Sequence, residues 1–597
     1  MSNRLANIIA ILLLLFMFLI AVFSMKGDSA TMDEVAHLPA GYSYLTQKDM
    51  RLNPEHPPLL KDLAAIPLLF VNAAASSIQE TIKFPADIKD WQEDINGQWG
   101  FGFHFLYQNG NPVDKMLFWG RIPMIFVLIL TGFFIFKWSK EAFGNKAALL
   151  SLFLFSFSPT FIAHGRLVTT DVGAAAGILI ATYYFLRFLK TPSRKNLVIA
   201  GIALAFAQLL KFNAVLLFPF FGMLIVVKSW IESFGLKSFL KSFFSCLLSF
   251  VSISIICFAL IWLVYLYHVW NYPPDRQARD IRFLLSTHPL QFSGPLLAWM
   301  AKISLLRPLA QYLLGVFLVF QRAAFGNTTY FLGEVSAAGW KIYFPTVYLI
   351  KEPLAFHLLT IIAILYAAWL IKEPLWKRPF ERTKNWIKSH FPEFTMFLFI
   401  SLYWAASLTS SLNIGVRHLL PVFPFTILLV SQGATKWLED FPYFKKGKWV
   451  LVTMLVFWQA ISVVSVYPYF LAYFNELVGG PKYGYQYVVD SNLDWGQDLK
   501  RLKKWVEENK VEKIYVDYFG GGDAKYYLKE KFRPWWGTRD PKELEKPGYL
   551  AVSATFLQGG RGKPVPGFNQ PFGYYLWLDK YKPVAQIGYS IFVYHIE

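Results

Sequence analysis

Two adjacent carboxylates and a short motif of acidic and basic residues follow the first apolar segment of the chain. Asp33 and Glu34 stand just outside that segment, and the run Glu55-His56-Pro57-Pro58-Leu59-Leu60-Lys61 comes later in the same loop. A carboxylate can accept a proton from a hydroxyl or an amine, and cationic groups can stabilise a leaving anion. Reactive groups at the face of a membrane span indicate chemistry on a lipid.

The first apolar segment itself extends over residues 5–24. Such a length crosses a hydrocarbon core of about 30 Å. A secretory signal has a shorter apolar region, of about 7–15 residues, and a small-x-small cleavage site, which is not evident here. We therefore favour an uncleaved signal anchor over a signal peptide.

The composition indicates the class of protein. Of the 597 residues, 18% are aromatic and only 16% are charged, and the mean hydropathy is +0.37. This is far more apolar than a soluble domain. We expect a polytopic α-helical membrane protein with about eleven transmembrane helices. The predicted spans are 5–24, 119–136, 147–163, 172–186, 197–210, 212–227, 242–267, 353–371, 394–411, 418–435 and 449–466.

Lysine and arginine collect beside alternate span ends. One connection contains Lys137, Lys140 and Lys146, and the next on the same side contains Arg187 and Lys190. Because basic residues are enriched in cytoplasmic loops, we expect a plasma (inner) membrane protein with a cytoplasmic N-terminus and an extracytoplasmic C-terminal part. This bias accounts for much of the net charge of +19, so we expect no nucleic-acid partner.

Three parts of the chain are then extracytoplasmic: the loops 25–118 and 268–352, and the tail 467–597. We divide the chain into a transmembrane domain, 1–466, and an extracytoplasmic α/β domain, 467–597. The apolar stretch 307–325 would invert the charge alternation if it crossed the membrane. We interpret it as interfacial, re-entrant or buried against other helices.

The tail has the pattern of a small α/β unit. Strands are predicted at 485–489, 513–518, 548–554 and 591–594, and a helix at 496–509. Asp494 precedes that helix and belongs either to a sugar-binding loop or, as we favour, to the helix N-cap. Gly520-Gly521-Gly522-Asp523 lacks the Lys-Ser/Thr of a P-loop, so we expect a turn into a helix.

Three short outer connections each contain a cation where the topology rule disfavours one. These cations are Arg166, Lys211 and Arg417. They could extend their charges to the lipid headgroups or pair with neighbouring acids. Together, beside a loop rich in carboxylates, they favour an anionic partner, and phosphate is the obvious one.

The ordered motifs resemble those of the GT-C glycosyltransferases that use polyprenyl-phosphate sugars. The nearest resemblance is to the protein O-mannosyltransferase and aminoarabinose transferase group (glycosyltransferase family 39-like). It covers roughly residues 1–230, and the later spans are similar only in architecture. The similar features are the Asp33-Glu34 pair at the start of the first outer loop, an HPPLxK-like motif at His56 to Lys61, an R-x4-D motif formed by Arg166 and Asp171, and Lys211 in a TKF-like position.

This resemblance implies a polyprenyl-phosphate-linked sugar as donor, membrane lipids as surroundings, and transfer with inversion to a protein, lipid or glycan acceptor. Asp33 is the expected general base, and Glu34 and Asp171 would orient the acceptor or the base, or hold a divalent cation. Glu55 and Asp494 are candidates for acceptor contacts. The expected phosphate contacts are His56, Lys61, Arg166, Lys211 and Arg417. No cofactor is certain, and a metal remains open because carboxylates suit hard cations.

Plainer interpretations stay open at each position. Asp33 and Glu34 could be a helix N-cap and a first-turn acid, Asp171 could cap a membrane helix, and His56 could be a turn residue. The tail does not resemble the β-trefoil insertion of the mannosyltransferases, so the acceptor is not indicated. The main rival function is a multispanning transporter, which would place its acids inside the membrane.

Overall fold

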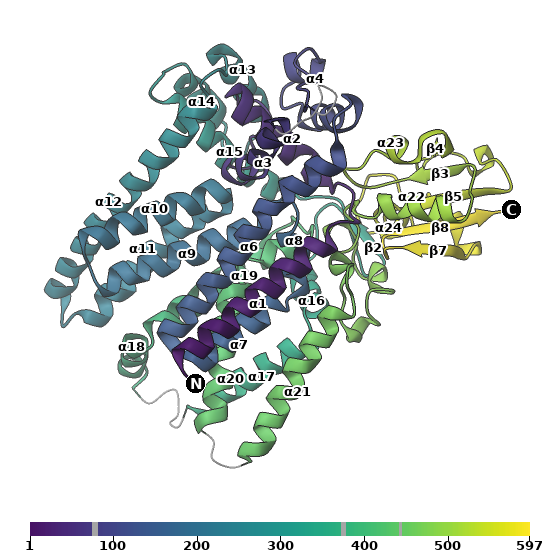
Figure 1. Cartoon of the computed structure of the whole chain (residues 1–597). Helices are drawn as coiled ribbons and strands as arrows, with labels where there is room; N and C mark the ends of the chain where they lie inside the picture. The colour runs from purple at the N-terminus through teal and green to yellow at the C-terminus, as the bar shows by residue number, and fades with distance from the viewer. Residues whose placement is uncertain (74–80, 372–377, 441–443) are drawn as a thin grey trace.

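The fold consists of one helical body with a mixed sheet beside it. The structure, a computed structural model of the chain, describes residues 1–73, 81–371, 378–440 and 444–597. In Figure 1 the N-terminus lies at one end of the helical body, and the strands near the C-terminus lie beside the opposite ends of α1 and α6.

Eight helices within the described ranges are long and apolar enough to cross a membrane, and two bent helix pairs raise this number to as many as 10. The eight are α1 (Asn3–Ser24), α6 (Val113–Phe143), α9 (Asp171–Lys190), η3 with α11 (Phe212–Glu232), α12 (Leu236–His268), α15 (Arg307–Phe325), α19 (Phe391–Thr409) and α21 (Lys445–Val464). The bent pairs are α7 (Asn145–Ser156) with α8 (Pro159–Gly165), at 60°, and α16 (Tyr343–Lys351) with α17 (Leu354–Trp369), at 110°.

The predicted class, a polytopic helical membrane protein, is confirmed, and each predicted span falls on a helix. The number differs from eleven for two reasons. Helices α10 (Arg194–Leu210) and α20 (Phe423–Asp440) do not belong to the set above, and α10 has only 17 residues. Helix α15, which we interpreted as interfacial, re-entrant or buried, has the length and hydropathy of a candidate span, with the same values as α19.

Shorter helices gather around the ends of the long ones. In Figure 1, α2, α3, α4, α13 and α14 form a group at the top of the view. The shorter helices are α2 (Met32–Gln47), α3 (Leu59–Ala73), α4 (Lys89–Gln92), α5 (Gln98–Phe103), η2 (His104–Gln108), α13 (Pro274–Leu284), α14 (Ser293–Ala301), α18 (Pro379–Ser389) and η4 (Val416–Leu419).

The C-terminal part is an α/β unit built on a five-stranded sheet of order β4-β3-β5-β8-β7. Strand β3 is parallel to β4 and β5, whereas β8 is antiparallel to β5 and β7. The strands are β3 (Ile514–Asp517), β4 (Phe532–Pro534), β5 (Gly548–Ser553), β7 (Pro583–Ile587) and β8 (Ile591–Ile596), and the helices are α22 (Leu499–Glu508), α23 (Ala524–Leu528) and α24 (Ala554–Gly559).

A second, small sheet ties this unit to the preceding chain. It has three strands, β1 (Thr329–Phe331), β2 (Glu334–Ser336) and β6 (Lys563–Pro564), in the order β1-β2-β6. Short 3₁₀ turns fill the connections: η5 (Phe470–Ala472), η6 (Glu476–Val478), η7 (Gly484–Gln486), η8 (Asp490–Asn492), η9 (Lys529–Lys531), η10 (Pro541–Glu543) and η11 (Leu576–Lys580). The C-terminal unit is therefore joined to the helical body through sheet as well as loop contacts.

Two local predictions in the tail are wrong. The strand predicted at 485–489 is mostly turn, since η7 occupies its first residues and Val488 forms only an isolated bridge with Phe331. The helix predicted from 496 begins at Leu499, because Gly496 has a φ of 95°, which a helix does not allow. Asp498, not Asp494, therefore occupies the N-cap position. The turn into a helix at Asp523 is confirmed, and its carboxylate accepts the Tyr526 N–H at 3.1 Å.

Gly41 shows how closely α2 and α3 pack. A Cβ atom at Gly41 would lie 2.0 Å from the backbone carbonyl oxygen of Lys61. Only a residue without a side chain permits this approach, and it holds the helix of Asp33 against the segment that follows His56.

We predict that Gly41→Ala destabilises the protein by about 1–3 kcal/mol, because backbone atoms must move to make room. Gly222→Ala is a matched control, because Gly222 is also helical but no neighbouring atom lies within 4 Å of its Cβ position. We expect the control to be neutral or more stable by up to about 1 kcal/mol. Thermal unfolding in detergent measures both, and equal midpoints for the two variants would contradict the packing described.

Candidate functional site

A cavity of about 600 Å³ lies where loops from distant parts of the chain meet the ends of α15 and α19. Much of its apolar lining comes from α15, from η3, which begins the candidate span continued by α11, and from α19. The polar lining includes Asp33, His37, Asn53, Glu55, His56, Gln98, Thr170, Lys211, Asn213, Arg322, Tyr403, Arg417 and His418. The cavity thus combines ionised groups with an aliphatic surface.

Arg417 joins the two carboxylates nearest to the cavity. Its Nη1 lies 2.7 Å from Oδ2 of Asp33 and 3.4 Å from Oδ2 of Asp171. Lys211 forms a further ion pair with Asp171. Burial alone would lower the pKa of Arg417, but the two carboxylates raise it above its usual range. The side chain of Asp33 remains 21% exposed, against 1% for Asp171, so Asp33 is the carboxylate that a second molecule can reach.

Three histidines line the same cavity: His37, His56 and His418. Nδ1 of His37 donates a hydrogen bond to the Val168 carbonyl at 2.9 Å, and since a carbonyl only accepts, Nε2 carries the free lone pair. The rings of His37 and His56 meet edge to face with centroids 5.0 Å apart. Burial lowers the pKa of all three imidazoles, so they are neutral at pH 7.

Several buried polar atoms of the lining residues have no hydrogen-bond partner within the described parts of the chain. These atoms are Oε2 of Glu55, Nδ1 of His56, Oδ1 of Asn213 and Nε of Arg417. The other carboxylate oxygen of Glu55 accepts from Asn96 at 2.8 Å and from Gln98 at 3.0 Å, so this side chain is held in place. Buried polar groups are normally paired, and unpaired ones around one cavity indicate a polar ligand.

Lys61 does not line the cavity but holds the loop that does. Its Nζ donates to the carbonyl oxygens of Asn53 and His56, each at 2.8 Å, and to the Tyr44 hydroxyl at 2.9 Å. The side chain is 1% exposed, and burial lowers its pKa to about 7. Lys61 thereby fixes the backbone that presents Glu55 and His56.

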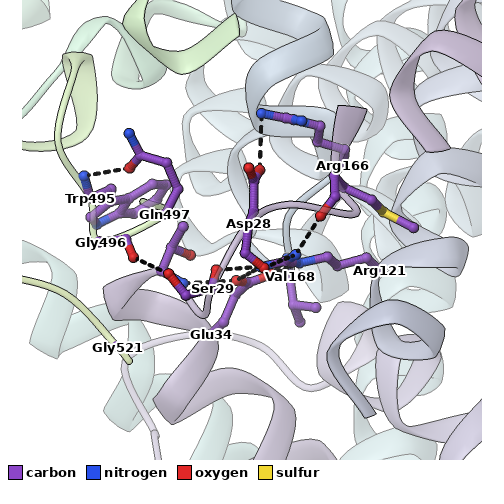
Figure 2. A network of polar contacts seen from close by, with 12 residues as sticks. Asp28, Ser29, Glu34, Arg121, Arg166, Val168, Trp495, Gly496, Gln497 and Gly521 are labelled. Atoms are coloured by element: carbon purple, nitrogen blue, oxygen red, sulfur yellow. Dashed lines mark hydrogen bonds and ion pairs between the residues drawn. The ribbon is translucent and has the colours of Figure 1, made fainter. Parts of the chain in front are cut away.

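Glu34 is likewise buried away from the cavity, in the network of Figure 2. Its carboxylate lies 2.6 and 2.8 Å from the guanidinium of Arg121 and accepts backbone N–H groups from Thr31 at 2.9 Å and Val168 at 3.0 Å. The bond from Val168 ties the start of α2, and hence Asp33, to the segment after α8, and the pair with Arg121 ties it to α6.

Arg166 belongs to the same buried region. Its Nη2 lies 3.0 Å from a carboxylate oxygen of Asp28, and Arg501 of the C-terminal unit reaches the other oxygen at 2.8 Å. The Arg166 side chain is 2% exposed. The structure therefore separates Arg166 and Lys61 from the other predicted phosphate contacts, His56, Lys211 and Arg417, which it brings together.

Asp494 is fully buried in the C-terminal unit and does not line the cavity. Its carboxylate accepts the Thr555 N–H at 2.9 Å, and its Oδ1 has no partner among the residues that the structure describes. Burial raises its pKa to about 8.

Sequence reasoning overlooked several lining residues. His37 follows Asp33 by one helical turn, a spacing that places both on one face of α2, and His418 directly follows Arg417. Arg322 is in the last turn of α15, which we had not counted as a span. Among the described residues, no group of three or more His, Cys, Asp or Glu side chains could hold a metal ion.

The sequence comparisons agree with the motifs. Residues 113–262 match the family model of the dolichyl-phosphate-mannose-protein mannosyltransferases. The match covers about a quarter of the chain. It confirms the resemblance to the GT-C glycosyltransferases, and with it the class of enzyme, a glycosyltransferase. No curated protein matches the chain by sequence.

Among solved structures, ArnT from Cupriavidus metallidurans bound to undecaprenyl phosphate is 12% identical, with 100% of this chain and 98% of that chain covered and a TM-score of 0.42. An Archaeoglobus fulgidus oligosaccharyltransferase in complex with zinc and sulfate is 11% identical, with coverages of 91% and 68% and a TM-score of 0.45. The S. cerevisiae protein O-mannosyltransferase Pmt1–Pmt2 complex bound to the sugar donor is 18% identical, with coverages of 45% and 34% and a TM-score of 0.32. These are similarities of low degree.

Asp494 generates a prediction about pH. In the folded protein the Asp494 carboxyl keeps its proton up to about pH 8. An Asp carboxyl in an unfolded chain loses its proton near about pH 3.9. The folded state therefore binds more protons between these values, and stability falls as pH rises, by up to about 1.4 kcal/mol per pH unit. We expect Asp494→Asn to remove this part of the slope.

Thermal unfolding of the wild type and of Asp494→Asn across that pH range checks the prediction. Asp87→Asn, at an exposed position of the first outer loop, is the control and should keep the wild-type slope. An Asp494→Asn protein with the full slope would show that the carboxyl is ionised in the fold.

Proposed function

We propose that the protein transfers a sugar from a polyprenyl-phosphate donor to a hydroxyl or amine at the extracytoplasmic face of the plasma (inner) membrane. The observation that carries the proposal is the cavity itself. Cations, a reachable carboxylate and unpaired polar atoms share its wall with aliphatic residues from candidate membrane spans. A phosphate joined to a long hydrocarbon chain matches both halves of this lining.

Arg417, Lys211 and His56 would contact the donor phosphate. Nε of Arg417 has no hydrogen-bond partner among the residues that the structure describes, and the side chain of Lys211, which lines the cavity, is 14% exposed. Cations placed where negative charge develops stabilise the leaving group as the bond to the sugar breaks. Lys61 and Arg166 act at a distance in this proposal, because neither side chain lines the cavity.

Asp33 would be the general base. In the proposed step the acceptor oxygen or nitrogen attacks the anomeric carbon from the face opposite the phosphate, and the proton of the acceptor passes to Asp33. The bond between the anomeric carbon and the phosphate oxygen breaks, and polyprenyl phosphate leaves with the electron pair. The configuration at the anomeric carbon is inverted.

The ion pair between Asp33 and Arg417 links the base to the phosphate site. While Arg417 is paired with Asp33 at 2.7 Å, its guanidinium occupies one oxygen of the carboxylate. A bound phosphate would compete for Arg417 and so free this oxygen for the acceptor. We propose that donor binding makes the carboxylate available to the acceptor in this way.

The residues of α15 and α19 would hold the first part of the prenyl chain. Val316, Val319 and Phe320 of α15 and Ala406 of α19 belong to the apolar lining. Both helices are candidate spans, so a chain between them passes directly from the cavity to the lipid. Protein, lipid and glycan acceptors all supply a suitable hydroxyl or amine, and the donor is the only small molecule that the proposal requires.

We predict that Asp33→Asn lowers the transfer rate by about 10²–10⁴-fold, because the amide cannot accept the proton. Transfer from a radiolabelled polyprenyl-phosphate sugar in proteoliposomes measures the rate. Asp87→Asn, at an exposed position in the same outer loop, is the control and should retain it. Full activity of folded Asp33→Asn would contradict the assignment of the base.

We also predict that Ala406→Trp discriminates between donors by chain length. The indole would fill space beside α15 and obstruct a long prenyl chain, so KM should rise for a full-length donor and change little for a donor with a two-isoprene chain. The matched control is Ala368→Trp on the exposed surface of α17. Equal effects on both donors would show that the chain does not follow this surface.

A further inference from the structure

Trp495 is the largest fully buried side chain within the described ranges, at 1% exposure. It lies in the loop between η8 and α22, in the C-terminal unit. The Arg417 guanidinium lies 4.1 Å from the centroid of its indole ring. Trp495 does not line the cavity, so any effect on a bound ligand must pass through Arg417.

We propose that Trp495 is a positioning residue of the donor-phosphate site, and that the loop 490–498 of the C-terminal unit sets the distance between Arg417 and Asp33. This inference rests on the proposed function, since it assigns Arg417 to the donor phosphate. It makes the C-terminal unit part of the active centre.

The guanidinium of Arg417 needs a support of this kind. Only its Nη1 is engaged by the two carboxylates, and its buried Nε has no partner in the described structure. A long side chain held through one nitrogen can rotate about that contact, and such rotation would misalign the guanidinium with a bound phosphate. The indole face, lying against the guanidinium, restricts this rotation and attracts the charge.

The same loop fixes the backbone on both sides of the ion pair. The Trp495 carbonyl accepts the N–H of Met32 at 3.0 Å, one residue before Asp33. The side-chain oxygen of Asn492 accepts the N–H of Val416 at 2.9 Å, one residue before Arg417. Base and cation come from segments far apart in the sequence, and two positions of one loop, 492 and 495, hold both.

Further contacts fix the position of the loop 490–498 relative to the segment that leads into α2. Figure 2 shows Ser29 bonded to the Gly496 carbonyl, at 2.7 Å, beside Trp495 and Gln497. The Ser29 N–H also donates to the Gln497 carbonyl at 2.9 Å. A Cβ at Gly521 would lie 2.2 Å from the Thr31 carbonyl oxygen. The glycine-rich turn after β3 thus allows close approach of two backbones, which explains its composition without a phosphate loop.

Lys351 anchors the other side of the loop. Its Nζ, 3% exposed, donates to the Asn492 carbonyl at 2.6 Å and to the carbonyls of Leu471 and Tyr473 at 2.9 and 2.6 Å. The loop is therefore attached to α16 as well as to α2, and it cannot shift without breaking buried bonds.

The test varies the electron density of the indole at constant shape. Fluorinated tryptophans incorporated at position 495 weaken the attraction of the ring for a cation while preserving its volume, so the fold is retained. We expect the donor KM to rise with the number of fluorine atoms, by about 3- to 30-fold for the fully fluorinated benzo ring, with the acceptor KM unchanged. The same replacement at Trp505, whose ring packs on Tyr549 in the same unit, is the control and should change neither constant.

One result would overturn the role of Trp495, and a different result would overturn the phosphate site on which that role rests. If fluorination at 495 leaves the donor KM unchanged while Arg417→Ala raises it, Trp495 only fills space and the proposed function stands. If Arg417→Ala also leaves the donor KM unchanged, the proposed phosphate site is wrong. Trp495→Phe keeps an aromatic face, so its donor KM should lie between that of the wild type and that of Trp495→Leu.

Discussion

Arg417 is the residue on which the arrangement of the site depends. It is a buried cation shared by Asp33 and Asp171, with Lys211 as a second cation on Asp171. Buried charges are tolerated only when they are paired, so these four side chains must be brought together for the fold to form at all. The same requirement places two cations and a carboxylate that a second molecule can reach around one cavity.

The constraint is met by segments that the sequence places far apart. Asp33 begins α2, Asp171 begins α9, Lys211 ends α10 and Arg417 lies in η4. Beneath them a second layer of buried pairs, Glu34 with Arg121 and Asp28 with Arg166 and Arg501, holds the backbone. Every guanidinium nitrogen of Arg121 donates a hydrogen bond within the protein, and Arg166 is buried away from the cavity, at 2% exposure. Burial away from the cavity separates these structural arginines from Arg417.

This distinction explains what the sequence could predict. Hydrophobic runs and the positions of Lys and Arg predicted the helical membrane class, because burial in lipid leaves few other patterns. Motif order predicted a role for Asp33, Glu55, His56 and Lys211, and the position of Arg417 in an outer connection predicted an anion contact. The structure gathers these residues at one cavity. The sequence could not predict that Lys61 and Arg166 are buried away from the cavity, since their partners Asn53 and Asp28 become neighbours only after folding. For the same reason the contact between Trp495 and Arg417 could not be predicted.

The central claim is that the cavity binds a prenyl phosphate, and native mass spectrometry of the purified protein tests it most directly. Wild type should retain an added mass equal to a polyprenyl phosphate, with or without a sugar, whereas an Arg417→Ala/Lys211→Ala protein should retain much less. If both proteins carried only ordinary phospholipids, the cavity would not be a donor site, and the result would favour the transporter hypothesis.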